Sequence, residues 1–229
     1  MSRVLTPVEG ASYLDKAAIP LVAQKLVSSA EEAAAAALVL GLPVALKLIA
    51  SAYTHKSDRG GVRLHVQTTR EVRDITTQLL ALGADLGDPG ATVLVQPMRK
   101  GVVELIIGLS RDPTFGPVVA VGLGGTLAEL LDDVVLGIPP LSRLQASEML
   151  EAMRSAELLD GYRGAPAVDR ASVVDLLLEV SRLADDENLI ELDFNPVVVG
   201  PIGEGCTVVD NRVVLRSAPV EPQRNPAPV

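Results

Sequence analysis

The order of helical and strand-like patterns restricts the fold of this chain more than any other feature of its 229 residues. Helical and strand-like segments alternate through the first half of the sequence. The last two strand-like segments, 189–199 and 206–216, are joined by "GPIGEG", which predicts a hairpin. Alternation alone would favour parallel layers, but a terminal hairpin requires antiparallel strands. The pattern therefore favours an α+β fold over a purely parallel, doubly wound sheet.

Helix starts and strand periodicities give the expected elements. A Ser or Thr three residues before a Glu predicts helices that begin after Ser29 and after Thr68. The first ends at Gly41, and the second runs towards Gly83. Amphipathic helices are expected over 142–159 and 169–184. Further strands are expected within 42–51, 62–68, 92–98 and 103–112, and 118–133 is expected to form a strand, a glycine turn and a helix.

Composition excludes several classes of protein. Aromatic residues make up 2 % of the chain, with no Trp, which argues against base-stacking surfaces for nucleic acid. The net charge of −9 argues against broad binding of a phosphate backbone. The most apolar window, 33–46, is too short to span a membrane. A single cysteine, Cys206, and the lack of a secretory signal indicate a cytoplasmic protein.

Domain organisation is expected to be simple. No internal repeat and no clear linker interrupts residues 1–217, so they are expected to form one domain of two lobes whose boundary is not readable. The Pro-rich segment 218–229 is expected to be extended or disordered.

The stretch "YTHKSDRGGV", residues 53–62, is unusually polar for this chain. Gly60 and Gly61 would let the backbone approach an anion, and Ser57 would add a hydroxyl beside a Lys and an Arg. His55 could act as a base or carry a phosphoryl group. A solvated surface turn explains the same residues, and spacing alone does not decide between the two interpretations.

Three further positions have a functional and a structural interpretation. Lys47, in an apolar strand, either points at an anion or, as is commoner, extends to a sheet edge. The backbone at Gln96, Pro97 and Met98 could offer N–H and C=O groups to an adenine edge, or could simply end a strand. Glu104 is either an exposed strand residue or a group that contacts ribose or a metal shell.

Several oxygen-bearing side chains cluster near the C-terminal end of the sequence. Glu191, Asp193 and Asn195 alternate and so share one face of a strand, and Asp210 is expected on the next strand. Such a set suits Mg²⁺ carrying nucleotide phosphates, and Asn195 with Asp210 could be enough. The alternative is the polar, solvent-facing side of a hairpin.

Taken together, the motifs "PVALKLIASAYTHKSDRGGVRL", "VLVQPM", "ELIIGLSRDPTFGPVVAVGLGGTLAELLDDV" and "ELDFNP" resemble the ATP-grasp domain, or β subunit, of NDP-forming acyl-CoA synthetases. ADP-forming acetate–CoA ligase is a member of this family, and succinyl-CoA synthetase β is a distant relative. The resemblance covers roughly residues 5–215. It implies the ATP-grasp fold, in which two α/β lobes hold ATP or ADP between them.

The resemblance also implies a reaction and its residues. The reaction is acyl-CoA + phosphate + ADP ⇌ acid + CoA + ATP, through an acyl phosphate and a phosphohistidine on a partner CoA-binding α subunit or domain. His55 matches a second phosphoryl carrier that passes the group to ADP, with the glycine pair and Ser57 cradling phosphate. The remaining matched positions are Lys47 for phosphate contact, Gln96 to Met98 for the adenine hinge, Glu104, and Asn195 and Asp210, with Asp193 nearby, for Mg²⁺.

Two departures from the family pattern keep an alternative open. Gly137 stands where an Arg is expected, and Asn211 stands where a small residue is more usual. The chain also has no CoA-binding domain, so it is expected to need a partner for the full reaction. The alternative function is a degenerate ATP-grasp module that binds nucleotide in a regulatory role, for example in a fused acyltransferase. An ATP-grasp ligase of another chemistry fits the histidine loop less well.

Overall fold

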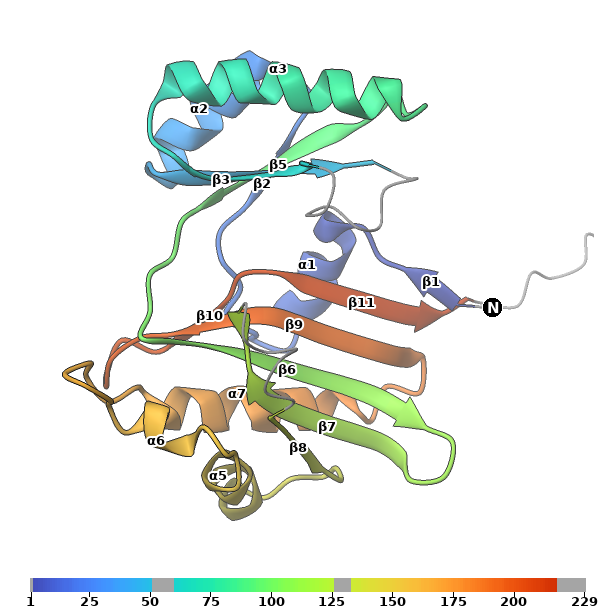
Figure 1. Ribbon diagram of the computed structural model, residues 1–229. Coiled ribbons are helices and arrows are strands. Elements are labelled where there is room, and N and C mark those ends of the chain that lie inside the picture. The colour runs from blue at the N-terminus through green and yellow to red at the C-terminus, as the bar shows by residue number, and fades with distance from the viewer. Residues whose placement is uncertain (1, 51–59, 126–132, 218–229) are drawn as a thin grey trace, which may run out of the picture. The chain divides into compact units, whose positions relative to one another are not determined.

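The computed structural model describes residues 2–50, 60–125 and 133–217. The chain forms two compact units, which we call the smaller unit (Pro20–Gly101) and the larger unit (Met1–Ile19 with Val102–Val229). Each has its own antiparallel sheet and its own helices (Figure 1), so the α+β class expected from the order of elements is confirmed. The loop around His55, the helix expected after Gly125 and the segment 218–229 lie outside the described residues.

The smaller unit is a four-stranded antiparallel sheet in the order β2-β5-β3-β4. Two helices, α2 (Ala30–Leu40) and α3 (Thr69–Asp85), begin where the sequence predicts. The Ser29 hydroxyl accepts the backbone N–H of Glu32, and Thr68 forms a reciprocal capping box with Glu71. The strands are β2 (Lys25–Val27), β3 (Val44–Ile49), β4 (Val62–Val66) and β5 (Thr92–Pro97).

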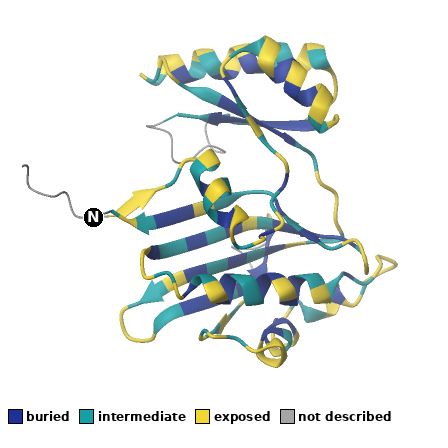
Figure 2. Cartoon of the chain, turned by 180° about the vertical axis from the view of Figure 1, so that it is seen from behind, coloured by how far each residue is buried: buried dark blue, intermediate teal, exposed yellow. Residues whose placement is uncertain are grey.

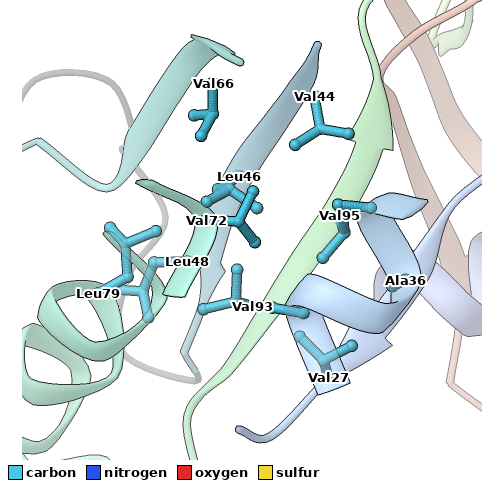
Figure 3. Close-up of a cluster of buried hydrophobic side chains, with 12 residues drawn as sticks. Val27, Ala36, Val44, Leu46, Leu48, Val66, Val72, Leu79, Val93 and Val95 are labelled. Carbon is cyan, nitrogen blue, oxygen red and sulfur yellow. The ribbon is translucent and has the colours of Figure 1, made fainter. Parts of the chain in front are cut away.

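Alternation along the strands separates the two faces of this smaller sheet. Leu46 and Leu48 of β3 lie in a fully apolar core with residues of α2 and α3, as Figure 3 shows. Val93 and Val95 of β5 belong to the same core. Because strand side chains alternate, Lys47 and its neighbours in register point to the opposite face. We call this opposite face, which carries Ala45, Lys47, Leu94 and Gln96, the Lys47 face.

The larger unit is a seven-stranded antiparallel sheet in the order β1-β11-β9-β6-β7-β8, with β10 paired to β9. The first strand and helix come from the N-terminus, and the rest of the unit follows after the smaller unit (Figure 1). The strands are β1 (Ser2–Val4), β6 (Val103–Asp112), β7 (Gly116–Leu123), β8 (Val134–Gly137), β9 (Leu189–Val199), β10 (Cys206–Val208) and β11 (Asn211–Arg216). The helices are α1 (Pro7–Asp15), α5 (Arg143–Glu151), α6 (Ala156–Leu159) and α7 (Arg170–Leu183).

One face of the larger sheet is apolar and the other is not. Leu105, Ile107 and Leu109 of β6 are buried, and the register places Leu192 and Phe194 of β9 on the same face. Helix α7 contacts β6 and β7 and buries its own apolar side (Figure 2). The residues between these apolar positions point the other way. We call that second face, which carries Glu191 and Asp193, the acidic face.

The "RDPTFGP" motif closes the hairpin between β6 and β7. The Arg111 guanidinium donates to the backbone oxygens of Leu189, Ala184 and Asp186, which fixes the C-terminal end of α7 against the sheet. The Asp112 carboxylate accepts the backbone N–H groups of the next turn residues, at 2.7 and 2.9 Å. In this structure the motif therefore has a structural role.

Two predicted elements are each divided in the structure. The helix expected over 142–159 is broken between α5 and α6, where the buried Asp133 carboxylate accepts the backbone N–H groups of Arg154 and Ser155. The strand expected over 206–216 is divided into β10 and β11, but both pair with β9 in one continuous register, and the Val209 N–H donates to the Pro196 oxygen at 3.0 Å between them. No helix in the described part of the chain is long and apolar enough to cross a bilayer.

Candidate functional site

The glycine pair of the polar loop is fixed at the end of β3. His55 and Ser57 lie outside the described residues, but Gly60 and Gly61 lie within them. The Gly61 backbone oxygen accepts the Leu48 N–H at 2.8 Å. Gly60 has φ +75°, a conformation that favours glycine, and its oxygen accepts from the Arg63 guanidinium. The loop therefore rejoins the sheet beside β3, the strand that carries Lys47.

Lys47 is a buried cation. It exposes 6 % of its surface, and its strand is flanked by β5 and β4, where Lys47 pairs with Leu94 and Val62. The expectation that this side chain extends to a sheet edge is therefore wrong. A buried ammonium requires compensating polar or anionic groups. Its position on the Lys47 face suits contact with an anion.

The segment at the end of β5 offers fewer backbone donors than the sequence suggested. Pro97 has no N–H, and the Met98 N–H donates to the Pro43 oxygen at 2.9 Å. The Gln96 side chain is 2 % exposed, and its Nε2 donates to Gln24 Oε1 at 2.9 Å. A ligand at Pro97 and Met98 therefore meets backbone carbonyl oxygens, not N–H groups.

Glu104 lies at the start of β6 against the "GLGG" turn. Its backbone oxygen accepts the Gly124 N–H at 2.7 Å. Gly125 has φ +75°, and a Cβ there would lie 3.0 Å from the Glu104 Oε2 atom, so the turn requires glycine. A pocket of about 400 Å³ opens at this point, lined by Glu104, residues 123–125, Leu158 and Tyr162. The size fits part of a small organic ligand.

The acidic face brings together the residues predicted to bind a metal. Glu191 and Asp193 alternate along β9, and the Asn195 N–H donates to the Asp210 backbone oxygen at 3.2 Å. Asp210 lies in the link between β10 and β11 and not in a strand as expected. Its carboxylate accepts the N–H of Asn211. Continued antiparallel register places Asn195 and Asp210 opposite each other, on the face that carries Asp193.

Electrostatics at this face favour a cation. The pKa of Asp193 is raised, first by burial and then by the negative charges of Glu191 and Asp210, while Arg212 opposes the shift. Glu191 forms an ion pair with Arg212. A bound cation would relieve the remaining repulsion. In the described ranges no three His, Cys, Asp or Glu side chains form a metal cluster, but Mg²⁺ needs only one or two carboxylates and oxygen donors of this kind.

Gly137 lies on the face opposite Asp193. The β7–β8 register pairs it with Val119, which is buried on the helix-covered side of the sheet. A Cβ at position 137 would lie 2.6 Å from the Met149 Sδ atom of α5. The side chain of Met149 therefore occupies the space that a longer residue at 137 would need. The absence of an Arg at position 137 therefore leaves the acidic face unchanged.

Two residues were missed by the sequence interpretation. Gln24 contacts Gln96 only because β2 and β5 pair, and no local motif marks it. Arg212 could have been found, because it lies two residues after Asp210 and therefore points to the same side of an extended segment. Its ion pair neutralises Glu191, which lies beside Asp193 on the acidic face.

Residues 1–215 match a family model described as an ATP-grasp domain. The chain is 36% identical over 213 residues to the β subunit of ADP-forming acetate–CoA ligase II from Pyrococcus furiosus, covering 91% of this chain and 90% of that subunit. It is 37% identical over 215 residues to a trans-feruloyl-CoA synthase from an unknown prokaryotic organism, covering 92% of this chain but 30% of that protein.

Solved structures agree with these matches. An acetyl-coenzyme A synthetase 1 from Ca. Korarchaeum cryptofilum, in complex with coenzyme A and Ca-AMPCP, aligns with TM-score 0.86 and 37% identity, over 93% of this chain and 94% of that chain. Another structure of that synthetase contains coenzyme A and Mg-AMPPCP and has its phosphohistidine segment pointing towards the nucleotide binding site. It aligns with TM-score 0.80 and 34% identity, over 93% of each chain.

Proposed function

This chain belongs to the ATP-grasp domain family, and we propose that it is the nucleotide-binding, phosphoryl-transferring component of an ADP-forming acyl-CoA synthetase. The observation that carries this proposal is the extent of the match: the chain corresponds to 90% and 93% of two acetate–CoA ligase β subunits. The full reaction then converts acyl-CoA, phosphate and ADP into the carboxylic acid, CoA and ATP.

His55 is the proposed phosphoryl carrier of this chain. A phosphohistidine on the partner transfers its phosphoryl group to the His55 imidazole, so that one N–P bond breaks as another forms. His55 then donates the group to the terminal phosphate oxygen of ADP, which forms ATP and restores the free imidazole. Each step is an in-line phosphoryl transfer that depends on positioning and charge neutralisation.

The smaller unit supplies the groups that hold phosphate in this proposal. Lys47 contributes a buried positive charge, and Gly60 and Gly61 leave the backbone open to close approach. Ser57 adds a hydroxyl from the same loop. Gln96, Pro97 and Met98 border the nucleotide base.

The larger unit supplies the proposed metal site. Asp193, Asn195 and Asp210 offer carboxylate and amide oxygens, which are the ligands that Mg²⁺ prefers. The pKa of Asp193, raised by burial and then by neighbouring negative charge, supports a cation at this position. A bound Mg²⁺ would neutralise the nucleotide phosphates during transfer. Glu104 is assigned to nucleotide contact because it borders the pocket at the "GLGG" turn.

The proposed partner is a CoA-binding α subunit or domain that forms the acyl phosphate and carries the first phosphohistidine. The chain spans 30% of the length of three longer relatives, which leaves room in those proteins for such a domain. A cytoplasmic location is part of this proposal. Because position 137 faces α5, Gly137 is compatible with an active chain and does not favour the degenerate alternative.

The test is a labelling experiment on the complex with the partner subunit, supplied with acyl-CoA and radiolabelled phosphate. We expect acid-labile, base-stable label on this chain, and we expect His55→Ala to abolish it while nucleotide affinity is kept. His65→Ala is the matched control, because the chain has 2 histidines and His65 lies exposed on β4. A His55→Ala complex with full label and full activity would reject the proposed role.

A further inference from the structure

Strand β8 forms one edge of the larger sheet, and its outer side is open. The sheet order ends on β8 (Figure 1), and among the residues that the structure describes no strand pairs with its outer side. The Leu123 N–H donates to the Asp133 oxygen at 3.3 Å, so the backbone of Asp133 faces β7. Because backbone groups alternate along an antiparallel strand, the N–H and C=O groups of Val134 and Leu136 point away from β7. Those groups are available to a further strand.

The side chains of the same residues form an exposed apolar row. Val134, Leu136 and Ile138 alternate along one face and expose 49%, 65% and 53% of their surface. The β7–β8 register puts them on the acidic face, opposite to the side of Gly137. Residues 134–142 contain no Lys, Arg, Asp or Glu, so no charge interrupts the row.

The other edge strands are protected in a way that β8 is not. The two sheet orders end on β1 and β8 in the larger unit and on β2 and β4 in the smaller unit. Arg3, Lys25 and Arg63 place a charge on β1, β2 and β4, and β1 and β2 have 3 residues each. Charged or short edge strands prevent unwanted pairing between chains. The uncharged edge of β8 is therefore the one suited to strand addition.

We infer that β8 pairs with β8 of a second copy of this chain, antiparallel and about a two-fold axis at Leu136. The two Leu136 residues then face each other, and Val134 of each copy faces Ile138 of the other. Opposed residues of this kind exchange two backbone hydrogen bonds. Apolar side chains meet only apolar side chains, and no like charges are opposed. A second copy meets these conditions by symmetry, because the same uncharged strand supplies both sides of the contact.

The test measures the mass of the full chain by sedimentation velocity over a series of protein concentrations. Wild-type protein should pass from monomer to dimer as the concentration rises. Leu136→Lys opposes two ammonium groups at the axis and should raise the dissociation constant of the dimer at least about tenfold. Leu136→Glu opposes two carboxylates and should have the same effect. An equimolar mixture of the two variants should restore the dimer, because opposite charges then face each other.

Leu64→Lys is the matched control, because Leu64 is an exposed leucine on the edge strand β4, which already carries Arg63. It should leave dimer formation unchanged, and thermal unfolding of each variant checks that it folds. Nucleotide binding does not enter these measurements, so their outcome is independent of the proposed function.

Three results would overturn the inference. The first is a wild-type chain that stays monomeric at every concentration, and the second is a dimer that Leu136→Lys leaves intact. The third is a mixture of the two charge variants that does not dimerise. If the wild-type chain is monomeric and Leu136→Lys instead weakens its complex with the CoA-binding partner, the edge belongs to that partner and self-pairing is wrong.

Discussion

The two units present opposite charge chemistry on their functional faces. On the Lys47 face of the smaller unit, the buried Lys47 shares one side of the sheet with the neutral amide side chain of Gln96. On the acidic face of the larger unit, Asp193 and Asp210 share a region where the pKa of Asp193 is raised. The first arrangement suits an anion and the second suits a cation. The proposed phosphate contact and the proposed metal contact thus belong to two different sheets.

The largest expected effect comes from removing the cation of the smaller unit. Lys47→Ala should weaken Mg-ADP binding on the order of 100-fold, because a charge-assisted contact with phosphate is lost from a buried position. Calorimetric titration measures this effect. Lys25→Ala, which removes an exposed lysine of the same unit, is the control and should bind normally. An unchanged dissociation constant for Mg-ADP in Lys47→Ala would show that Lys47 does not contact the phosphates. The contrast between the two faces would then have no role in nucleotide binding.

Introducing at position 137 the Arg that the sequence resemblance leads us to expect should destabilise the larger unit without improving function. Gly137→Arg places a Cβ 2.6 Å from Met149 Sδ, and such overpacking costs about 1–3 kcal/mol. Urea unfolding measures this loss. Adding Met149→Ala should recover part of it, so the two changes should be non-additive.

The stability and activity of Gly137→Arg also test which face of the larger sheet position 137 lies on. A Gly137→Arg variant with normal stability and faster phosphoryl transfer would mean that this position reaches the phosphates. The conclusion that Gly137 lies away from the acidic face would then be wrong.

A smaller effect is expected from the acidic face. Asp210→Ala should weaken Mg²⁺-dependent nucleotide binding roughly tenfold, because one carboxylate near a divalent ion is lost. The loss should disappear when binding is measured without Mg²⁺, whereas the Lys47→Ala loss should persist. Asp175→Ala, at an exposed carboxylate of α7, is the matched control. An equal loss of nucleotide affinity with and without Mg²⁺ would show that Asp210 does not bind the metal.

Local signals predicted most of the fold. The Thr68 capping box fixed the start of α3, and the turn between β9 and β10 was readable from "GPIGEG". The apolar alternation along β9 likewise predicts that Glu191 and Asp193 share one face, and the strand has that pattern. These features depend on residues close together in the sequence, so the sequence contains them directly.

Long-range contacts account for what the sequence did not predict. The break between α5 and α6 depends on Asp133, about twenty residues earlier in the chain. The Gln24–Gln96 contact joins residues 72 apart and needs the β2–β5 register. The burial of Lys47 follows from the central position of β3, which its own apolar run does not reveal. The order in which the strands pair cannot be read from local sequence. This limited the interpretation of the site more than errors in secondary-structure propensity did.

The most direct test of the central claim follows one phosphoryl group. The chain is labelled in the complex with the partner subunit, acyl-CoA and radiolabelled phosphate, separated from the partner, and then mixed with Mg-ADP. The account predicts that the label leaves the chain and appears in ATP. Label that stays on the protein, or is released only as inorganic phosphate, would contradict it.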